Sequence, residues 1–470
     1  MSTRIEKDSM GEMPVPASAL YGASTQRAVL NFPISGMPFT RPFIRAVGII
    51  KAAAAHANEK LGKLPKDIAE HIVKAAEEVV EGKLDEHFPI DIYQTGSGTS
   101  TNMNANEVIS NRVSQSVGTP IGSKKPVHPN DHVNMGQSSN DTIPTAMHIS
   151  AAETLKNVLR PALSNLHAGL EVKAKEFWDV IKIGRTHLMD ATPVRLGQEF
   201  AGYARQTVLA LRRVDKAIEA LHELPLGGTA VGTGLNCHPE FPAIAIAEIS
   251  RRTGIKFVEA KDHFEAQSAK DGFVEASGQL KGVATSLFKI AMDIRWLGSG
   301  PRCGIGEISL PATQPGSSIM PGKVNPVMAE ALLMACATVV GGDATITWAA
   351  ANGSSFELNV AMPVMAHTFL ENTRILASAV QAFQDKCVAG ITANKARCNE
   401  LVEYSMAMVT SLAPIIGYDR AAEIAKESAK TGRTVRELCT EKKVLPPDEL
   451  AKALDPVEMT KPGGEGSGGG

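Results

Sequence analysis

The chain has 470 residues, of which 43% are hydrophobic and 21% are charged, and its formal net charge is −2. This balance is ordinary for a water-soluble globular protein with a large core, and it excludes a generally basic surface of the kind that binds nucleic acids. The six cysteines include no C-x-x-C pair, so we expect reduced thiols and no metal site. The N-terminus lacks the apolar stretch of a signal peptide, which favours the cytoplasm. A transit peptide that had been removed would leave the mitochondrial matrix open.

The N-terminal region, which we predict as one domain over residues 1–137, starts without a clear pattern. Residues 1–40 contain several Pro and Gly, so we expect them to wrap a surface. Helical periodicity follows over residues 41–61 and 65–82. A glycine-rich turn from Thr95 to Thr101 then leads into an amide-rich segment. Such a turn is usually only a connection, but the amides that follow favour a polar network or a ligand contact.

Two histidines lie four residues apart in the run His128-Pro129-Asn130-Asp131-His132. That spacing could serve a metal on a helix, but Pro129 and Asn130 disfavour the helix. No further Cys/His set lies nearby, so we expect no metal. A helix start capped by Asn130 or Asp131 is the simplest interpretation.

The central region, predicted as a second domain over residues 138–390, is dominated by long helical patterns. Its start, Ser138-Ser139-Asn140, either caps a helix or binds an anion at the helix N-terminus. Such lengths predict a mainly all-α fold built on a long bundle, whose helices bury more than one face against other copies of the chain. Polar and glycine residues interrupt the most apolar pattern, so we expect no membrane span. The long patterns cover residues 146–177, 196–221, 266–297, 329–350 and 363–389.

Two shorter stretches of the central region carry candidate chemistry. Thr186-His187 lies between two long helices, and a lone histidine is more often structural than catalytic. The glycine-rich run Leu226 to His238 lacks both a preceding strand and the G-x-G-x-x-G spacing, so we expect no dinucleotide. A small C-terminal domain with short helices is predicted over residues 391–462. The glycine-rich residues 463–470 are predicted to be a disordered tail.

The most informative stretch is Gly316 to Pro326, which reads GSSIMPGKVNP. Its glycines and prolines exclude a regular helix or central strand, so it is a loop that carries two hydroxyls, a cation and an amide. A phosphate loop fits poorly, because five residues separate the two glycines and Val324 follows Lys323. A surface connection without function and an anion-binding, catalytic loop both stay open on the pattern alone.

This loop resembles the signature of the fumarase/aspartase superfamily, GSSxMPxKxNP, at every fixed position. The resemblance extends from about Glu6 to Met459 and is closest to the class II fumarases. It implies a mainly α-helical fold of three domains, in which five long helices per chain build a core of about twenty helices in a homotetramer. It also implies that three subunits contribute to each active site.

The activity implied by the resemblance is the reversible anti addition of water to fumarate, which gives malate in the tricarboxylic acid cycle, without cofactor or metal. It makes Ser317 the base that removes a carbon-bound proton, His187 an acid or base acting with a bound water, and Glu330 their support. The implied substrate-binding residues are Ser97, Gly98, Thr99, Ser138, Ser139, Asn140, Thr186, Ser318, Lys323, Val324 and Asn325. The implied second anion site comprises His128, Pro129, Asn130 and Asp131.

Two other functions remain open at this point. Aspartate ammonia-lyases share the signature, but they typically carry Gln where this chain has His187, so the histidine favours hydration. A non-catalytic structural protein with the same fold would be expected to have lost Ser317 or His187, and both are present. Met135-Gly136 and Met189 depart from the residues expected in the resemblance.

Overall fold

The computed structural model describes residues 2–462, and the predicted tail at 463–470 lies outside them. The described chain is mainly helical, as expected, and its strands form only two-stranded pairs. Contacts divide it into two compact units. The first comprises Met1–Pro161, Leu211–Thr285 and Ala335–Ala377. The second comprises Ala162–Ala210, Ser286–Met334 and Ser378–Gly470. The three domains predicted from the sequence stay a prediction.

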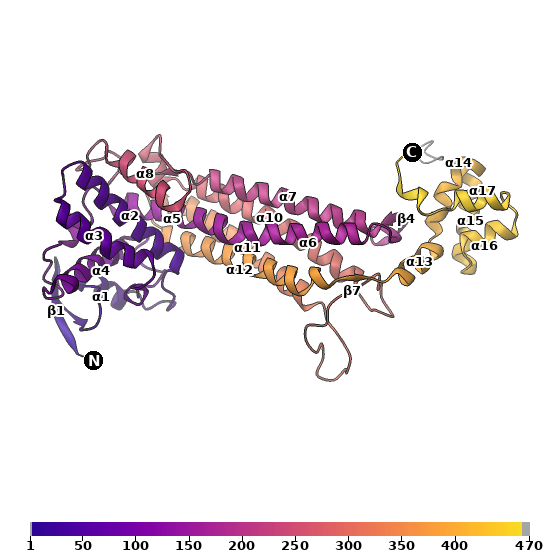
Figure 1. Cartoon of the computed structure of the whole chain (residues 1–470), viewed down its shortest axis with the longest axis horizontal. Coiled ribbons are helices and arrows are strands. Elements are labelled where there is room, and N and C mark those ends of the chain that lie inside the picture. Colours follow the sequence, from indigo (N-terminus) through magenta and orange to yellow (C-terminus); the bar gives the residue numbers. More distant parts are fainter. Residues whose placement is uncertain (1, 463–470) are drawn as a thin grey trace. The chain divides into compact units, whose positions relative to one another are not determined.

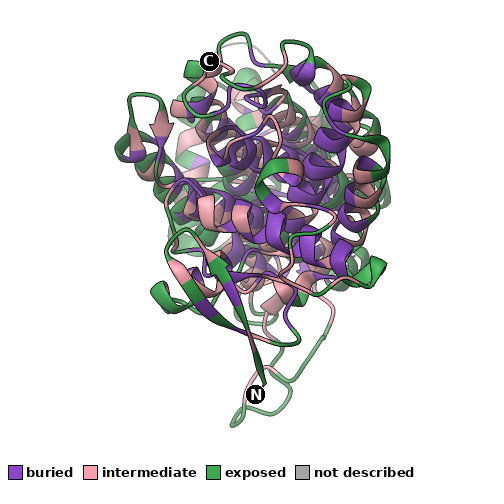
Figure 2. Ribbon diagram, turned by 90° about the vertical axis from the view of Figure 1, so that its left-hand side faces the viewer, coloured by how far each residue is buried: buried purple, intermediate pink, exposed green. Residues whose placement is uncertain are grey.

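The N-terminal stretch of the first unit is more regular than its sequence indicates. Strands β1 (Thr3–Asp8) and β2 (Gly11–Pro16) form an antiparallel hairpin that ends near the label N in Figure 2, and helix α1 spans Ala23–Asn31. Met13 and Val15 turn inward onto a small apolar cluster. The sequence predicted neither this hairpin nor α1, because the alternation of β1 runs through charged side chains.

Helix α2 (Arg41–Lys60) is the central helix of the first unit. Its residues from Ala52 to Ala55 are all buried, and a Cβ at Gly48 would lie 3.1 Å from Val79. Such small side chains let neighbouring helices approach α2 closely on several sides. Its neighbours are α3 (Lys66–Val80), α4 (Thr99–Val117), α5 (Ser139–Thr154) and α8 (Phe241–Thr253).

Four of the five predicted long patterns each correspond to one long helix, with α10 starting later than expected. The pattern at 146–177 is divided between the end of α5, a π-helical segment at Leu155–Leu159, and α6. In the first unit Ser277 and Lys281 of α10 donate hydrogen bonds to Asp343 of α11. In the second unit the Tyr203 hydroxyl of α7 donates to Asp293 of α10. Contacts between these helices thus exist within each unit. The long helices, labelled in Figure 1, are α6 (Arg160–Glu176), α7 (Leu196–Glu219), α10 (Asp271–Leu297), α11 (Val327–Gly353) and α12 (Met362–Lys386).

Helix α11 has a length and composition that would allow it to cross a membrane. The expectation that its polar interruptions exclude this was therefore too strong as an argument from composition. Core helices of water-soluble proteins satisfy the same criterion. Buried Asp343 has partners on α10, and Gly342 fits against Asn372 of α12, where a Cβ would lie 2.0 Å from the Asn372 amide nitrogen. Helix α11 thus packs as a bundle helix.

The C-terminal part of the second unit is a group of short helices around an apolar cluster that includes Leu412, Ile424 and Leu438. The hairpin of β3 (Ile181–Thr186) and β4 (Met189–Arg195) contributes Ile181 to this cluster. The sequence did not predict this hairpin. The short helices are α13 (Lys395–Tyr404), α14 (Ala413–Ile416), α15 (Tyr418–Thr431), α16 (Val435–Glu441) and α17 (Pro447–Ala453). The remaining helix and strands are α9 (His263–Ser268), β5 (Glu223–Leu224), β6 (Val258–Glu259), β7 (Ile308–Ser309), β8 (Ser354–Ser355), β9 (Leu358–Asn359) and β10 (Thr392–Ala393).

Candidate active site

The first set of predicted site residues lies where two helix N-termini meet in the first unit. Thr99 is the first residue of α4 and Ser139 the first of α5, and their hydroxyl oxygens are 2.8 Å apart. Ser97 Oγ lies 2.8 Å from Thr99 Oγ1. Gly98, with a φ of 70°, makes the turn before α4. Helix N-termini carry partial positive charge and unpaired N–H groups, so this meeting point is suited to a carboxylate.

Asp141 anchors the start of α5. The hydroxyl of Ser138 accepts the Asn140 N–H, and the Ser138 N–H donates to Asp141 Oδ1 over 2.9 Å. Asp141 Oδ2 accepts the N–H groups of Gly227 and Thr229 over 3.1 and 2.9 Å. Burial raises the pKa of Asp141, while these N–H donors favour its carboxylate form. The predicted Ser-Ser-Asn segment is thus tied to the glycine-rich run after β5.

A buried lysine joins the two substrate segments from behind. Lys51 of α2 is fully buried, and its ammonium donates to Asn102 Oδ1 over 2.7 Å. It also donates to the side-chain oxygens of Asn134 and Gln137, both over 3.0 Å. Burial lowers the pKa of Lys51 to about 7. Because Asn102 lies in α4 and Gln137 just before α5, this ammonium links the starts of both helices.

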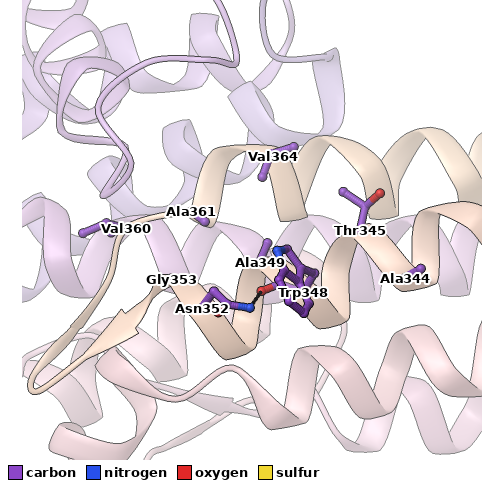
Figure 3. Close-up of a pocket in the computed structure, with 9 residues that line it drawn as sticks. All are labelled: Ala344, Thr345, Trp348, Ala349, Asn352, Gly353, Val360, Ala361 and Val364. Carbon is purple, nitrogen blue, oxygen red and sulfur yellow. Dashed lines mark hydrogen bonds between the residues drawn. The ribbon is translucent and has the colours of Figure 1, made fainter.

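The glycine-rich turn before α4 has no room for a side chain at Gly96. A Cβ there would lie 1.6 Å from the carbonyl oxygen of Val360, and the Gly96 carbonyl accepts the Met362 N–H over 3.0 Å. Beside Val360 is a hollow of about 660 Å³, and Figure 3 shows Trp348 and Asn352 on its wall. None of the predicted site residues lines this hollow.

The second set is the signature loop in the second unit. The loop is closed at its base, where the Gly316 N–H donates to the Lys323 carbonyl over 2.8 Å and Asn325 Nδ2 donates to the Gly316 carbonyl over 2.7 Å. A Cβ at Gly316 would lie 2.4 Å from the Lys323 carbonyl oxygen. Ser318, Lys323 and Val324 are exposed. The loop encloses a hollow of about 460 Å³.

The hydroxyl of Ser317 lies inside the turn of this loop. Its oxygen accepts the N–H groups of Ile319 and Met320 over 3.2 and 3.0 Å. Two N–H donors aimed at one oxygen stabilise negative charge on it, as they would at the start of a helix. The loop therefore supplies a physical means of favouring the deprotonated form of Ser317.

Glu330 lies in the first turn of the helix that follows the loop. Its N–H donates to the Pro326 carbonyl over 3.1 Å. Its carboxylate is 3.9 Å from the guanidinium of Arg295 on α10, so the pair is long and partly exposed. A carboxylate in the first helical turn is favoured by the helix dipole. No hydrogen bond joins Glu330 to Ser317 or His187 within residues 2–462.

Thr186 and His187 lie at the tip of the β3–β4 hairpin. Thr186 pairs with Met189, so His187 and Leu188 form a two-residue turn. Both have positive φ, 57° and 60°. Turns of this kind favour Asn and Gly, and each bulky residue held in this region costs about 1–3 kcal/mol. Both His187 and Thr186 are exposed, and neither is hydrogen-bonded to the signature loop in the part of the chain that the structure describes.

The run predicted as a second anion site begins a short π-helical turn. It is capped by His128, whose Nδ1 accepts the N–H groups of Asn130 and Asp131 over 3.2 and 3.1 Å. The expectation that Asn130 or Asp131 caps this turn was wrong. Because Nδ1 accepts these two hydrogen bonds, the ring hydrogen is on Nε2, where it can donate. Burial also lowers the pKa of His128. Pro129 is buried, and the other two residues are exposed.

Within the first unit the structure brings Ser97–Thr99 together with Ser138–Asn140. Within the second unit Glu330 follows the signature loop, and no hydrogen bond in the described chain joins Thr186 or His187 to that loop. Sequence reasoning missed Lys51 and Asp141. An isolated lysine in an alanine-rich helix was the available signal for the first. A capping-box spacing from Ser138 was the signal for the second.

Comparisons with known proteins place this chain in a family. A lyase family model matches residues 11–341, and a model described as the fumarase C C-terminus matches residues 408–461. The class II fumarate hydratase of Halobacterium salinarum is 55% identical over 98% of this chain and 97% of its own length. The mitochondrial fumarate hydratase of Rattus norvegicus is 51% identical over 98% of this chain and 91% of its own. The crystal structure of a class II fumarase from Schistosoma mansoni superposes with a TM-score of 0.95 at 38% identity, covering 98% of this chain and all of that one. This chain belongs to the class II fumarate hydratase family of lyases.

Proposed function

We propose that this chain is a fumarate hydratase, a hydro-lyase that interconverts fumarate and malate in the tricarboxylic acid cycle. The observation that carries the proposal is the geometry of Ser317, whose hydroxyl oxygen accepts two main-chain N–H groups inside a complete signature loop. A serine is a weak base unless its alkoxide is stabilised, and these donors provide that stabilisation. Ser317 then removes the proton from the carbon beside a malate carboxylate.

The carbanion that forms pushes charge onto the neighbouring carboxylate, and the same loop supplies its partners. Lys323 is exposed above the loop and brings a positive charge. Asn325 uses one amide hydrogen to close the loop, which leaves its second amide hydrogen for the substrate. Ser318 and the Val324 main chain complete this carboxylate site. Donors fixed before the reaction stabilise the developing charge at little reorganisation cost.

The hydroxide that leaves malate takes a proton from His187, directly or through a water. Imidazole is the side chain best suited to exchange protons near neutral pH. Thr186, adjacent on the same hairpin tip, binds the substrate. Glu330 supports the proton relay. The second carboxylate of the substrate binds where Thr99 meets Ser139.

We also propose a homotetramer in which three subunits contribute to each active site. Helix α11 exposes Val340, Ala344 and Trp348 at helical spacing, and Trp348 is 73% exposed. A helix that is apolar on several faces needs further cover, which other copies of the chain supply. The hollow beside Trp348 (Figure 3) is part of the covered surface. Light scattering should give four times the mass of one chain. A monomer with full activity would refute the shared site.

Two further expectations belong to this proposal. The run His128-Pro129-Asn130-Asp131 forms a second anion site, in which the ring Nε2–H of His128 and the exposed side-chain amide of Asn130 would donate hydrogen bonds to the anion. Calorimetric titration of malate into a Ser317→Ala variant would show whether binding there survives, and His128→Ala should weaken it. We place the enzyme in the cytoplasm, with the mitochondrial matrix as the alternative that cell fractionation would distinguish.

The activity is tested by following the ultraviolet absorbance of fumarate with malate as substrate. The parent should form fumarate without added metal or organic cofactor, and Ser317→Ala should lose activity at least about 100-fold. Ser116→Ala, a substitution at an exposed serine on α4, serves as the control and should retain full activity. Product from aspartate but not from malate would identify an ammonia-lyase instead. No turnover of either would favour a non-catalytic protein.

A further inference from the structure

A buried charge network stands behind the hairpin that carries His187. Glu307 is fully buried, and its Oε2 accepts a hydrogen bond from Arg185 over 2.9 Å. The ammonium of Lys182, also on β3, lies 3.3 Å from the same oxygen. Lys182 donates in addition to Glu199 of α7 over 2.8 Å. Two residues of one strand are thus bound to a single carboxylate.

Glu307 is itself fixed by its main chain. Its N–H donates to the Leu297 carbonyl at the end of α10, and its own carbonyl accepts the N–H of Asn394 and the thiol of Cys398. These main-chain hydrogen bonds fix the position from which the Glu307 side chain extends. Its other oxygen, Oε1, has no hydrogen-bond partner within the described chain. Burying a carboxylate costs desolvation free energy, which its ion pairs and hydrogen bonds must offset.

The hairpin tip needs such a fixed point. His187 and Leu188 both occupy the left-handed region, and strained conformations persist only where the surroundings hold them. Arg185 lies two residues before His187, and β3 breaks its pairing register between Ile183 and Arg185. Strand pairing alone therefore fixes the tip less well than a regular ladder would.

We propose that Glu307 is a positioning residue that, through Arg185, holds the His187–Leu188 turn in the conformation the reaction needs. This inference rests on the proposed function, because it assigns the turn a role in proton transfer. Glu307 touches no reacting atom. It fixes where the imidazole can be, and a misplacement of about 1 Å can cost about 100-fold in rate.

The network contains its own control. Glu199 is a second carboxylate bound to Lys182, but no hydrogen bond joins it to Arg185. Glu307→Gln and Glu199→Gln each remove one negative charge from the same network at nearly constant volume. Both should lower stability. Only Glu307→Gln removes the negative charge that pairs with Arg185, so only this variant should weaken the hold on the turn.

The test compares malate turnover by the two tetrameric variants with that of the parent. We expect Glu307→Gln to lower kcat about 10- to 100-fold and to change KM less than about 3-fold, while Glu199→Gln keeps kcat within about 3-fold of the parent. Arg185→Lys, which retains a charge but loses the guanidinium, should resemble Glu307→Gln. If Glu307→Gln does not fold, the kcat of Arg185→Lys tests the proposal in its place. Equal kcat values for the Glu307 and Glu199 variants, or an unimpaired Arg185→Lys, would overturn the proposal.

A failure of the proposed function would look different. If the parent does not convert malate, the positioning role is still measurable as amide hydrogen exchange over residues 184–190. Glu307→Gln should accelerate exchange there at least about 10-fold more than Glu199→Gln does. Equal exchange in the two variants would refute the role of Glu307 independently of any activity.

Discussion

Replacing Asp141 by Asn should destabilise the protein measurably, because the amide has only one oxygen to accept the hydrogen bonds that two carboxylate oxygens accept in the parent. In the structure Oδ1 accepts the Ser138 N–H and Oδ2 accepts the N–H groups of Gly227 and Thr229. An amide has a single oxygen, so one side of the side chain must turn an NH₂ group toward donors. Hydrogen bonds to a charged acceptor contribute about 1.5–3 kcal/mol each. Relief of the buried charge offsets part of the loss, which leaves about 3 kcal/mol.

This loss converts into a shift that calorimetry resolves. Unfolding entropy is about 2.1 cal/mol/K per residue, so a chain of 470 residues loses about 1 °C of Tm per kcal/mol. Asp141→Asn should therefore melt about 3 °C below the parent at equal protein concentration. Asp262→Asn is the matched control, because Asp262 caps α9 at the surface and Asn caps equally well. An Asp141 variant that melts together with its Asp262 control would refute this account of the anchor.

Three further substitutions test other contacts. Lys51→Met leaves three amide oxygens without their common donor and should lower the free energy of unfolding, measured by urea titration, by about 3 kcal/mol. The control is Lys60→Met at the exposed end of α2, which should change it little. Gly96→Ala places a methyl group against the Val360 carbonyl and should cost at least about 2 kcal/mol and reduce malate turnover, since the turn must move. Burial lowers the pKa of His148 to about 4. Between pH 6.5 and pH 4 the unfolded chain therefore binds a proton that the folded chain does not. Through this ring, acid lowers the free energy of unfolding by at most about 3 kcal/mol. His148→Gln should therefore flatten the fall of the urea midpoint between pH 7 and pH 5, and an unchanged slope would show that other groups cause it.

Much of the helical framework could be predicted from periodicity. Helices α2 and α7 agree with the expected residues within one or two. The spacing of apolar residues in a long helix follows its buried face, so such helices can be predicted from sequence. The β3–β4 hairpin was missed because its tip, His187-Leu188, lacks the Asn or Gly that usually marks such a turn. Its strain comes from tertiary contacts, and local sequence does not encode it.

The candidate site was predictable as a set of segments and not as an arrangement. The Gly316–Pro326 signature indicated the family, and the comparisons confirm it. The partners of the residues that anchor the site could not be predicted, for a physical reason. Lys51 and Glu307 act through partners that are distant along the chain, so no window of sequence contains both ends of their interactions. The individual roles assigned to the site residues stay predictions.

The donors that surround Ser317 have a consequence for how this loop can change. Both come from the main chain, and the side chain of Ile319 is 84% exposed. Position 319 should therefore tolerate large, small, charged or apolar replacements with little effect, since each still presents the same amide hydrogen. Proline is the exception, because it has none. The stabilisation of the Ser317 oxygen therefore does not depend on which side chain is at position 319.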